Sequence, residues 1–213
     1  LLRGVDENKD QSYALAGIDR QYLSRMLLPV GGYHKTEIRQ MAGQAGLRVA
    51  NKRDSQEICF VTSGHHGDFV RARSGAGKAG NFVTTEGRVV GKHSGIESFT
   101  IGQRKGLGIA LGEPMFVVRI DAETNEVVLG HTESLLRESL SASEANWLID
   151  PPDSPFEALA QIRYNATAVP VTVYPQGPAR FLVKFHRAIQ SVAPGQLCVV
   201  YDQQRVLGGG WVD

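Results

Sequence analysis

The sequence predicts an α+β protein of several domains: the helical tail of an α/β domain, a small β-rich central domain and a C-terminal six-stranded β-barrel. Three observations support this class. Helical spacing dominates residues 1–63, hairpin patterns dominate residues 64–137, and short, evenly spaced strand patterns fill residues 138–213. A chain of 213 residues has room for two or three small domains.

Residues 1–63 are expected to be mainly helical. Asp10 can cap a helix through residues 11–15, and Asp19 can cap a second helix through residues 22–26. Apolar residues at helical spacing predict a third helix over residues 38–45, and Gly46 ends it. Residues 47–50 are interpreted as a short strand. This order is typical of the tail of an α/β domain, and because the chain starts at Leu1 without Met or a signal peptide, it is interpreted as a fragment.

The central region has two predicted hairpins, over residues 82–90 and 116–130. A glycine-rich loop, Gly102–Gly108, lies between them and carries Arg104 and Lys105. Glycines let a backbone approach a phosphate chain closely, and two cations would neutralise it. The loop is therefore a candidate RNA contact, with an ordinary solvated loop as the alternative.

The last region has six strand candidates separated by turn residues. They cover residues 141–147, 157–164, 168–174, 179–185, 196–202 and 205–210. Closing such strands into a small barrel removes their exposed edges. Arg163 and Tyr164, at the end of one candidate, offer a guanidinium and a stacking ring side by side, which suits unstacked RNA bases or an ordinary surface pair.

Composition excludes few functions. The net charge of +1 gives no overall polycationic character, although local basic patches remain compatible with nucleic acid. No apolar run is long enough to span a membrane, so we expect no membrane association. Two cysteines in unlike contexts argue against a disulfide framework and for a reducing, cytoplasmic compartment.

The two cysteines differ in their surroundings. Cys59 lies in the polar run Asp54–Phe60, where the upstream Lys52 and Arg53 favour the thiolate and nearby carboxylates oppose it. Cys198 lies in an apolar strand pattern and is expected to be a small core residue. Cys59 is therefore the candidate reactive thiol, with a core role as the alternative. A metal site is not predicted, because a fourth ligand is not identifiable. A Cys–His hydrolase is not predicted, because an oxyanion hole is not identifiable.

Six runs, in order along the chain, resemble the tRNA-specific 2-thiouridylases of the MnmA type. They are Lys9-Asp10-Gln11-Ser12-Tyr13, Pro29-Val30-Gly31, Asp54-Ser55-x-x-Ile58-Cys59-Phe60, Thr100–Gly108, Pro194-Gly195-Gln196 and Gly208-Gly209-Gly210. Together they extend over nearly the whole chain.

The resemblance implies a sulfurtransferase that acts on tRNA. Such enzymes activate the C2 oxygen of the wobble uridine with ATP, expected with Mg²⁺, and replace that oxygen with sulfur. Cys59 matches the cysteine that carries the sulfur as a persulfide, loaded by a sulfur-donor protein. Residues that match tRNA-contacting positions are Lys9, Asp10, Gln11, Arg163, Tyr164 and Gln196.

The resemblance also implies a PP-loop adenylating domain, of which residues 1–63 would be the C-terminal part. The Ser-Gly-Gly-Val-Asp-Ser phosphate loop of that domain does not occur in this sequence, nor does the second catalytic cysteine. ATP would therefore be bound mainly by a portion upstream of Leu1, and the isolated chain is predicted to be inactive. A non-catalytic RNA-binding module and a sulfur-relay protein are the alternative functions.

Overall fold

The computed structural model describes residues 1–52, 77–190 and 192–213. These residues divide into two compact units. One unit contains residues 1–52, 138–187 and 194–213, and the other contains residues 77–137, 188–190 and 192–193. Cys59 lies outside the described residues.

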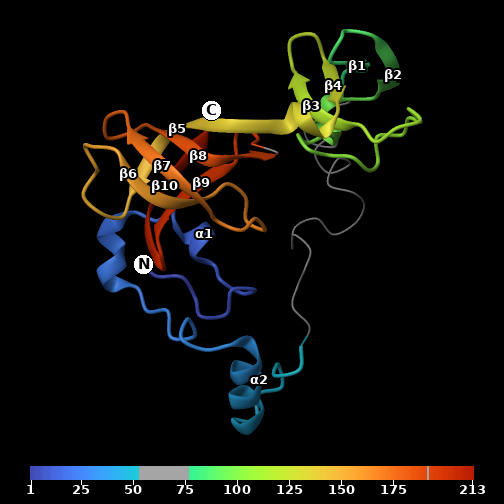
Figure 1. Cartoon of the computed structure of the whole chain (residues 1–213). Coiled ribbons are helices and arrows are strands. Elements are labelled where there is room, and N and C mark those ends of the chain that lie inside the picture. The colour runs from blue at the N-terminus through green and yellow to red at the C-terminus, as the bar shows by residue number, and fades with distance from the viewer. Residues whose placement is uncertain (53–76, 191) are drawn as a thin grey trace. The chain divides into compact units, whose positions relative to one another are not determined.

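The first unit is built on a closed six-stranded barrel, as the sequence predicted (Figure 1). Its strands, β5 to β10, follow the order β10-β5-β8-β7-β6-β9 around the barrel. Their bounds are Leu136–Trp147, Phe156–Gln161, Val169–Pro175, Phe181–Gln190, Leu197–Asp202 and Arg205–Val212. Alternate residues of β7 and β8 are fully buried, including Val171, Val173 and Val183, because every second side chain of a barrel strand points inward.

The glycine run on β10 reflects the close approach of neighbouring strands. A Cβ atom at Gly209 would lie 2.8 Å from the carbonyl oxygen of Cys198, on β9. A Cβ atom at Gly210 would lie 2.8 Å from the carbonyl oxygen of Ser143, on β5. These distances are too short for a side chain, so the run is required by the barrel itself.

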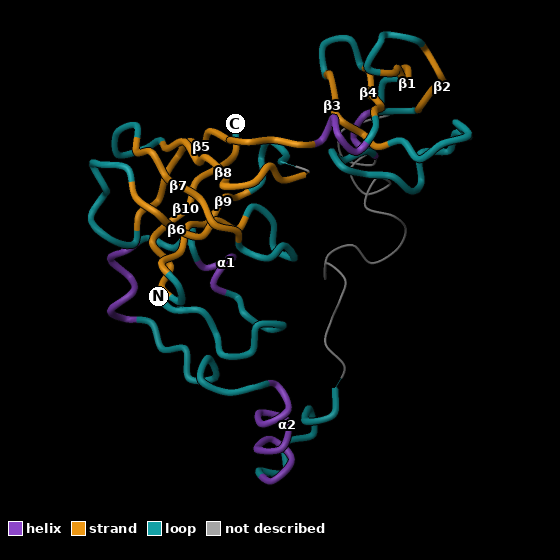
Figure 2. Tube along the Cα trace, in the orientation of Figure 1, coloured by secondary structure: helices purple, strands orange, loops and turns teal. Residues whose placement is uncertain are grey.

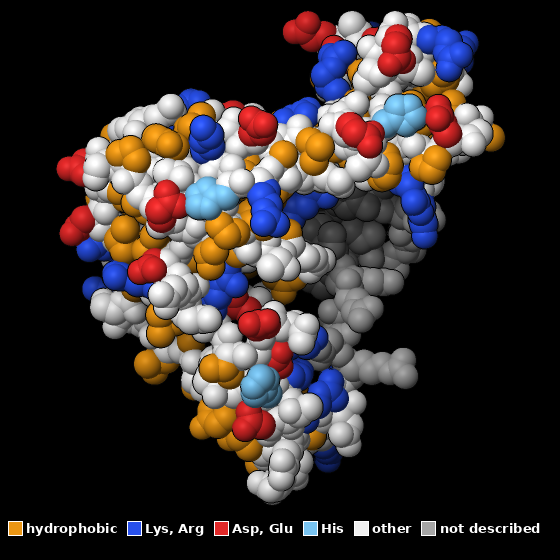
Figure 3. Space-filling view, in the orientation of Figure 1, with side chains coloured by type: hydrophobic (Ala, Val, Ile, Leu, Met, Phe, Trp, Pro, Cys, Tyr) orange, Lys and Arg blue, Asp and Glu red, His pale blue; other side chains and the backbone are white. Residues whose placement is uncertain are grey.

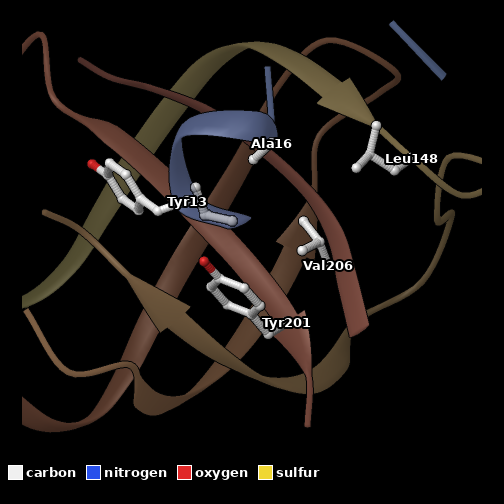
Figure 4. Packing of buried hydrophobic residues seen from close by; sticks show 6 residues of the cluster. Tyr13, Ala16, Leu148, Tyr201 and Val206 are labelled. Atoms are coloured by element: carbon white, nitrogen blue, oxygen red, sulfur yellow. The ribbon is translucent and has the colours of Figure 1, made fainter. Parts of the chain in front are cut away.

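The N-terminal segment is attached to the outside of the barrel. The backbone N–H of Val206 donates to the carbonyl of Leu1 (3.0 Å), and the N–H of Arg3 donates to the carbonyl of Gln204 (2.8 Å). Helix α1 (Ser12–Leu15) then lies over strands β9 and β10 (Figure 4). Its apolar side chains join one buried cluster with the barrel: Tyr13, Ala16, Leu148, Val199, Tyr201 and Val206.

The rest of the N-terminal segment follows the sequence prediction only partly. Asp19 caps the next helix as predicted, but that helix, η1 (Arg20–Arg25), is a 3-10 helix. The third predicted helix is α2 (Lys35–Gln44), which Gly46 follows with φ of 69°. The predicted strand over residues 47–50 is wrong. These residues form turns, in which the N–H of Ala50 donates to the carbonyl of Leu47, and no strand pairs with them among the described residues.

The second unit is a four-stranded sheet with the order β2-β1-β4-β3 (Figure 2). The strands are β1 (Gly80–Thr84), β2 (Val89–His93), β3 (Phe116–Asp121) and β4 (Glu126–Gly130), with short 3-10 helices η2 (Ile96–Ser98) and η3 (Thr132–Leu135). Both predicted hairpins are confirmed as antiparallel pairs, and a parallel pairing of β1 with β4 joins them. The core of the unit contains Phe82, Met115, Val117, Val127 and Leu129.

Within the described residues, the helices are all too short or too polar to cross a membrane.

Candidate nucleic-acid interface

A series of polar contacts connects the predicted RNA-contacting segment at residues 9–11 with the barrel. The Asp10 carboxylate accepts hydrogen bonds from the N–H of Gly4 (2.9 Å) and from the N–H and hydroxyl of Ser12 (3.0 and 2.6 Å). The Ser12 hydroxyl lies 3.4 Å from the hydroxyl of Tyr201, on β9. Ser12 and Tyr201 are both buried, so these contacts fix the segment on the barrel.

The same contacts continue to the second predicted segment, Arg163-Tyr164. The Tyr201 hydroxyl donates to Oε1 of Gln161, at the end of β6 (3.3 Å). The Nε2 group of Gln161 then donates to the carbonyls of Arg163 (3.1 Å) and Tyr164 (2.9 Å). Gln161, which is buried, therefore fixes the backbone positions of Arg163 and Tyr164 just after β6.

The two predicted segments also meet directly at the surface. Nε2 of Gln11 donates to the hydroxyl of Tyr164 at 2.5 Å, although the residues are 153 positions apart. The rings of Tyr164 and Tyr13 pack edge to face with their centroids 6.1 Å apart. Tyr164 nevertheless remains 47% exposed, so its ring is held in a defined position and is still available to a ligand.

Tyr13 connects this surface with strand β9. Its hydroxyl donates to the carbonyl of Leu197 at 2.6 Å, and Leu197 follows the predicted contact residue Gln196. Burial raises the pKa of Tyr13 to about 12, with further contributions from Cys198 and Tyr201. The phenol therefore stays protonated well into the alkaline range and keeps its role as a donor.

The structure thus brings together most of the barrel-side residues that the sequence predicted. Lys9, Gln11, Tyr164 and Gln196 are exposed, and Arg163 is half-buried. Asp10 is half-buried, and its carboxylate accepts hydrogen bonds from Gly4 and Ser12. Its direct contact with RNA stays a prediction, and the geometry gives it a positioning role for Gln11.

Sequence reasoning assigned no role to three residues that organise this surface: Ser12, Gln161 and Tyr201. Ser12 and Gln161 are buried polar residues, and Tyr201 is completely buried. Gln161 and Tyr201 are polar residues within apolar strand patterns. A buried polar group needs a hydrogen-bond partner, so this pattern could have indicated that both residues make specific buried contacts. Their partners come from distant parts of the chain, which periodicity cannot identify.

Arg104 and Lys105 lie in the second unit and are both exposed. Their loop is anchored on β3, because the N–H of Gly102 donates to the carbonyl of Val117 (2.7 Å) and the N–H of Val117 donates to that of Gln103 (2.9 Å). Gly102, Gly106 and Gly108 have φ of 87°, 75° and 74°, which explains the repeated glycine. The loop therefore has a defined backbone, and its contact with RNA stays a prediction.

A pocket of about 340 Å³ adjoins this loop. Arg104 and Glu113 supply its charged groups, and the remaining lining is mostly apolar: Leu107, Ile109, Leu111, Pro114 and Met115. One cation beside one carboxylate makes a weak anion site, so the pocket by itself does not indicate a phosphate ligand.

Cys198 is the described cysteine, and it is completely buried. Burial raises the pKa of its thiol to about 12. A thiol that stays protonated is a poor nucleophile, so the prediction that Cys198 is a core residue is confirmed.

Among the described residues, no group of three or more His, Cys, Asp or Glu side chains could hold a metal. The first turn of α2 carries Glu37, whose carboxylate accepts a hydrogen bond from the N–H of His34 (2.7 Å) and would repel a phosphate. We therefore assign no step of ATP chemistry to these residues.

Charge on the barrel is mixed. Figure 3 shows acidic and basic side chains interspersed over the visible face of the barrel, in agreement with the net charge of +1. RNA binding by this surface would therefore depend on discrete contacts more than on a strong overall field.

Comparison with known proteins gives the family. Three family models match in order: a tRNA methyl transferase HUP domain at residues 1–63, a tRNA methyl transferase PRC-barrel domain at residues 67–131, and an aminomethyltransferase beta-barrel domain at residues 137–212. A tRNA-specific 2-thiouridylase MnmA from Rhodopirellula baltica is 54% identical over the whole chain. The chain belongs to the MnmA family of tRNA-specific 2-thiouridylases. MnmA proteins from Carboxydothermus hydrogenoformans and Clostridium beijerinckii are 45% and 42% identical, again over the whole chain.

The chain spans 55–60% of the length of these three MnmA relatives. The matched ranges agree with an organisation into a HUP region, a central domain and a C-terminal barrel. In this MnmA family member, the described part of the HUP region, residues 1–52, belongs to the same compact unit as the barrel. That the region is the helical tail of a PP-loop domain stays a prediction.

Proposed function

We propose that the protein is a tRNA 2-thiouridylase in which this chain supplies the tRNA-binding surface and the sulfur-carrying cysteine. The observation that carries the proposal is the hydrogen bond between Gln11 and Tyr164. It joins, on one surface, two segments that match the tRNA-contacting positions of the family. Relatives along the whole chain are named tRNA-specific 2-thiouridylases, which supports tRNA as the substrate.

The reaction proposed is replacement of the C2 oxygen of the wobble uridine by sulfur. ATP is the co-substrate that would make this oxygen a leaving group, and the HUP match at residues 1–63 supports the use of ATP. The Ser-Gly-Gly-Val-Asp-Ser phosphate loop is not found in the 213 residues. This chain alone is therefore expected to bind tRNA without activating it.

The described residues would act by holding the RNA. Tyr164 offers a ring for stacking on an unpaired base, while Gln11 and Gln196 offer amide groups to base edges or the sugar-phosphate backbone. Arg163 adds a guanidinium for phosphate. The buried contacts of Ser12, Tyr201 and Gln161 position these groups before RNA arrives, which lowers the entropic cost of binding.

Cys59 is proposed to carry the transferred sulfur as a persulfide, loaded by a sulfur-donor protein in the cytoplasm. The alternative thiol, Cys198, is buried and protonated. By elimination, a reactive sulfur in this chain would be on Cys59.

The test compares Cys59→Ala with the matched variant Cys198→Ala in the protein as its gene encodes it. Both variants exchange one thiol for a methyl group, and 2-thiouridine in tRNA is measured by mass spectrometry in cells that lack their own 2-thiouridylase. We expect Cys59→Ala to abolish 2-thiouridine and Cys198→Ala to retain it. Undiminished thiolation by Cys59→Ala would refute the role of that cysteine.

A further inference from the structure

The two tryptophans of the chain have opposite environments. Trp147 is 7% exposed and packs between Phe156 and Phe181 in the barrel, with ring centroids 6.4 and 5.3 Å away. Trp211 lies on strand β10 and is 47% exposed. An exposed tryptophan on a rigid strand keeps a large apolar ring in water, which indicates a binding surface when recognition groups lie beside it.

The strand partners of Trp211 connect it with the candidate interface. In the barrel it pairs with Leu197 of β9 on one side and with Ser143 of β5 on the other. Paired residues of antiparallel strands point to the same face, so Trp211 and Leu197 are neighbours on that face. The carbonyl of Leu197 accepts the hydroxyl of Tyr13, and the ring of Tyr13 packs on that of Tyr164.

Gln196 is close to the same tryptophan. The N–H of Val212 donates to the carbonyl of Gln196 at 2.8 Å, which places Gln196 across from the residue that follows Trp211. Trp211 therefore adjoins the candidate interface through Leu197. The Gln196 contact is made by its backbone carbonyl opposite Val212, a buried residue on the other face of β10 from Trp211.

A guanidinium is fixed near the end of β10. Arg180 donates to one Asp213 carboxylate oxygen (2.6 Å), and the Ser143 hydroxyl donates to the other (2.6 Å). The Arg180 side chain is still 53% exposed. Asp213 offsets the positive charge of Arg180, so the Arg180–Asp213 pair offers hydrogen-bonding groups to a ligand but little net electrostatic attraction. The ring of Trp211 would therefore be the main source of binding affinity at this end of β10.

We propose that Trp211 stacks on an unpaired base of the bound tRNA. The inference rests on the proposed function, which supplies tRNA as the ligand. A base is favoured over an apolar protein segment because the adjoining candidate interface offers the Gln11 amide and the Tyr164 ring, and the end of β10 offers the Arg180 guanidinium. Such groups recognise bases and the sugar-phosphate backbone. Every base has a face that can stack on an indole, so this contact would add affinity with little sequence preference.

Tryptophan fluorescence of the 213-residue chain tests this directly. Trp147 is buried, so quenching of emission by an added tRNA transcript, and protection from iodide, would report on Trp211. We expect both effects in the unaltered chain. Trp211→Phe should leave only the emission of Trp147, which tRNA should not change.

Affinities measured by filter binding complete the test. Trp211→Leu keeps an apolar side chain without a ring and should bind tRNA roughly tenfold more weakly. Trp211→Phe should stay within about threefold of the unaltered chain, because a ring remains to stack on the base. The matched control is Tyr174→Leu, on β7, where the tyrosine is 36% exposed and should not affect binding.

The possible failures are distinguishable. Two results would overturn the stacking role and leave the proposed function intact. One is Trp211 emission that is not quenched at saturating tRNA. The other is an unchanged tRNA affinity of Trp211→Leu while Tyr164→Leu binds tRNA weakly. A change of oligomeric state in Trp211→Leu without a change in affinity would make the surface a protein contact and also overturn it. If the unaltered chain does not bind tRNA, the tRNA-binding part of the proposed function fails first.

Discussion

Nε2 of Gln11 donates a 2.5 Å hydrogen bond to the hydroxyl of Tyr164, 153 positions further along the chain. Gln11 precedes a short helix in the HUP region, and Tyr164 follows a barrel strand. Neither segment presents the surface alone. The candidate interface therefore exists only when the N-terminal segment is attached to the barrel.

This contact can be tested with a double-mutant cycle of Gln11→Ala and Tyr164→Phe. Each variant removes one partner of the same hydrogen bond, so each should weaken tRNA affinity by about 2- to 10-fold. The tRNA affinity of the double variant should decrease by less than the product of the two single-variant factors, because the first substitution already removes the hydrogen bond. Tyr174→Phe, on β7, is the control. Fully multiplicative losses would show that the bond does not couple the two segments in RNA binding.

Ser12→Ala should weaken the attachment of the N-terminal segment to the barrel. The Ser12 hydroxyl is buried, donates to Asp10 and lies 3.4 Å from the hydroxyl of Tyr201. Its removal leaves these polar groups without that partner, at a cost of about 1–3 kcal/mol in the free energy of unfolding. Urea unfolding measures the loss, with Ser24→Ala, at an exposed position of η1, as the neutral control. Equal unfolding free energies for the two variants would contradict this assignment.

Alkaline pH should destabilise the barrel through two buried groups. Burial raises the pKa of both the Cys198 thiol and the Tyr13 phenol to about 12. An unfolded thiol ionises near pH 8.5 and an unfolded phenol near pH 10, so from about pH 9 to 12 the unfolded chain releases protons that the folded chain keeps. The unfolding free energy must therefore be highest below this window and decrease as the pH rises through it.

The thiol's share of this effect can be isolated with Cys198→Ala. The variant should show a shallower decrease in unfolding free energy between pH 9 and 12, whatever its stability at pH 8. Parallel curves for the variant and the unaltered chain, measured by urea unfolding, would argue against the raised pKa of Cys198.

The elements that the sequence predicted well are those set by local patterns. Short, evenly spaced strand patterns and the turn residues between them identified all six barrel strands, and Glu86-Gly87 marked the hairpin of β1 and β2. The parallel pairing of β1 with β4 and the attachment of Leu1 and Arg3 to the strand that begins at Arg205 were not predicted. Both join residues far apart in the chain, where the register depends on packing that periodicity does not contain. Residues 47–50 failed for the same reason, because strand propensity has no effect without a neighbouring strand.

The candidate site shows a similar limit. The family resemblance named Gln11, Tyr164 and Gln196 one by one, and the structure adds how they are held. Tyr201 lies in an apolar strand pattern, yet the guanidinium of Arg3 lies 3.8 Å from the centre of its ring and its hydroxyl contacts Ser12 and Gln161. Such a residue acts through partners from three separate segments, and only the folded chain shows that they meet.

Ultraviolet crosslinking of the 213-residue chain to a tRNA transcript, with the crosslinked peptides mapped by mass spectrometry, tests the central claim most directly. The claim is that the N-terminal segment and the barrel form one tRNA surface. Crosslinks are expected in peptides that contain residues 9–11, 163–164 and 196, and they should decrease together in Ser12→Ala, which weakens the attachment of the segment. Crosslinks confined to β7 and β8, on strands without these residues, would contradict it.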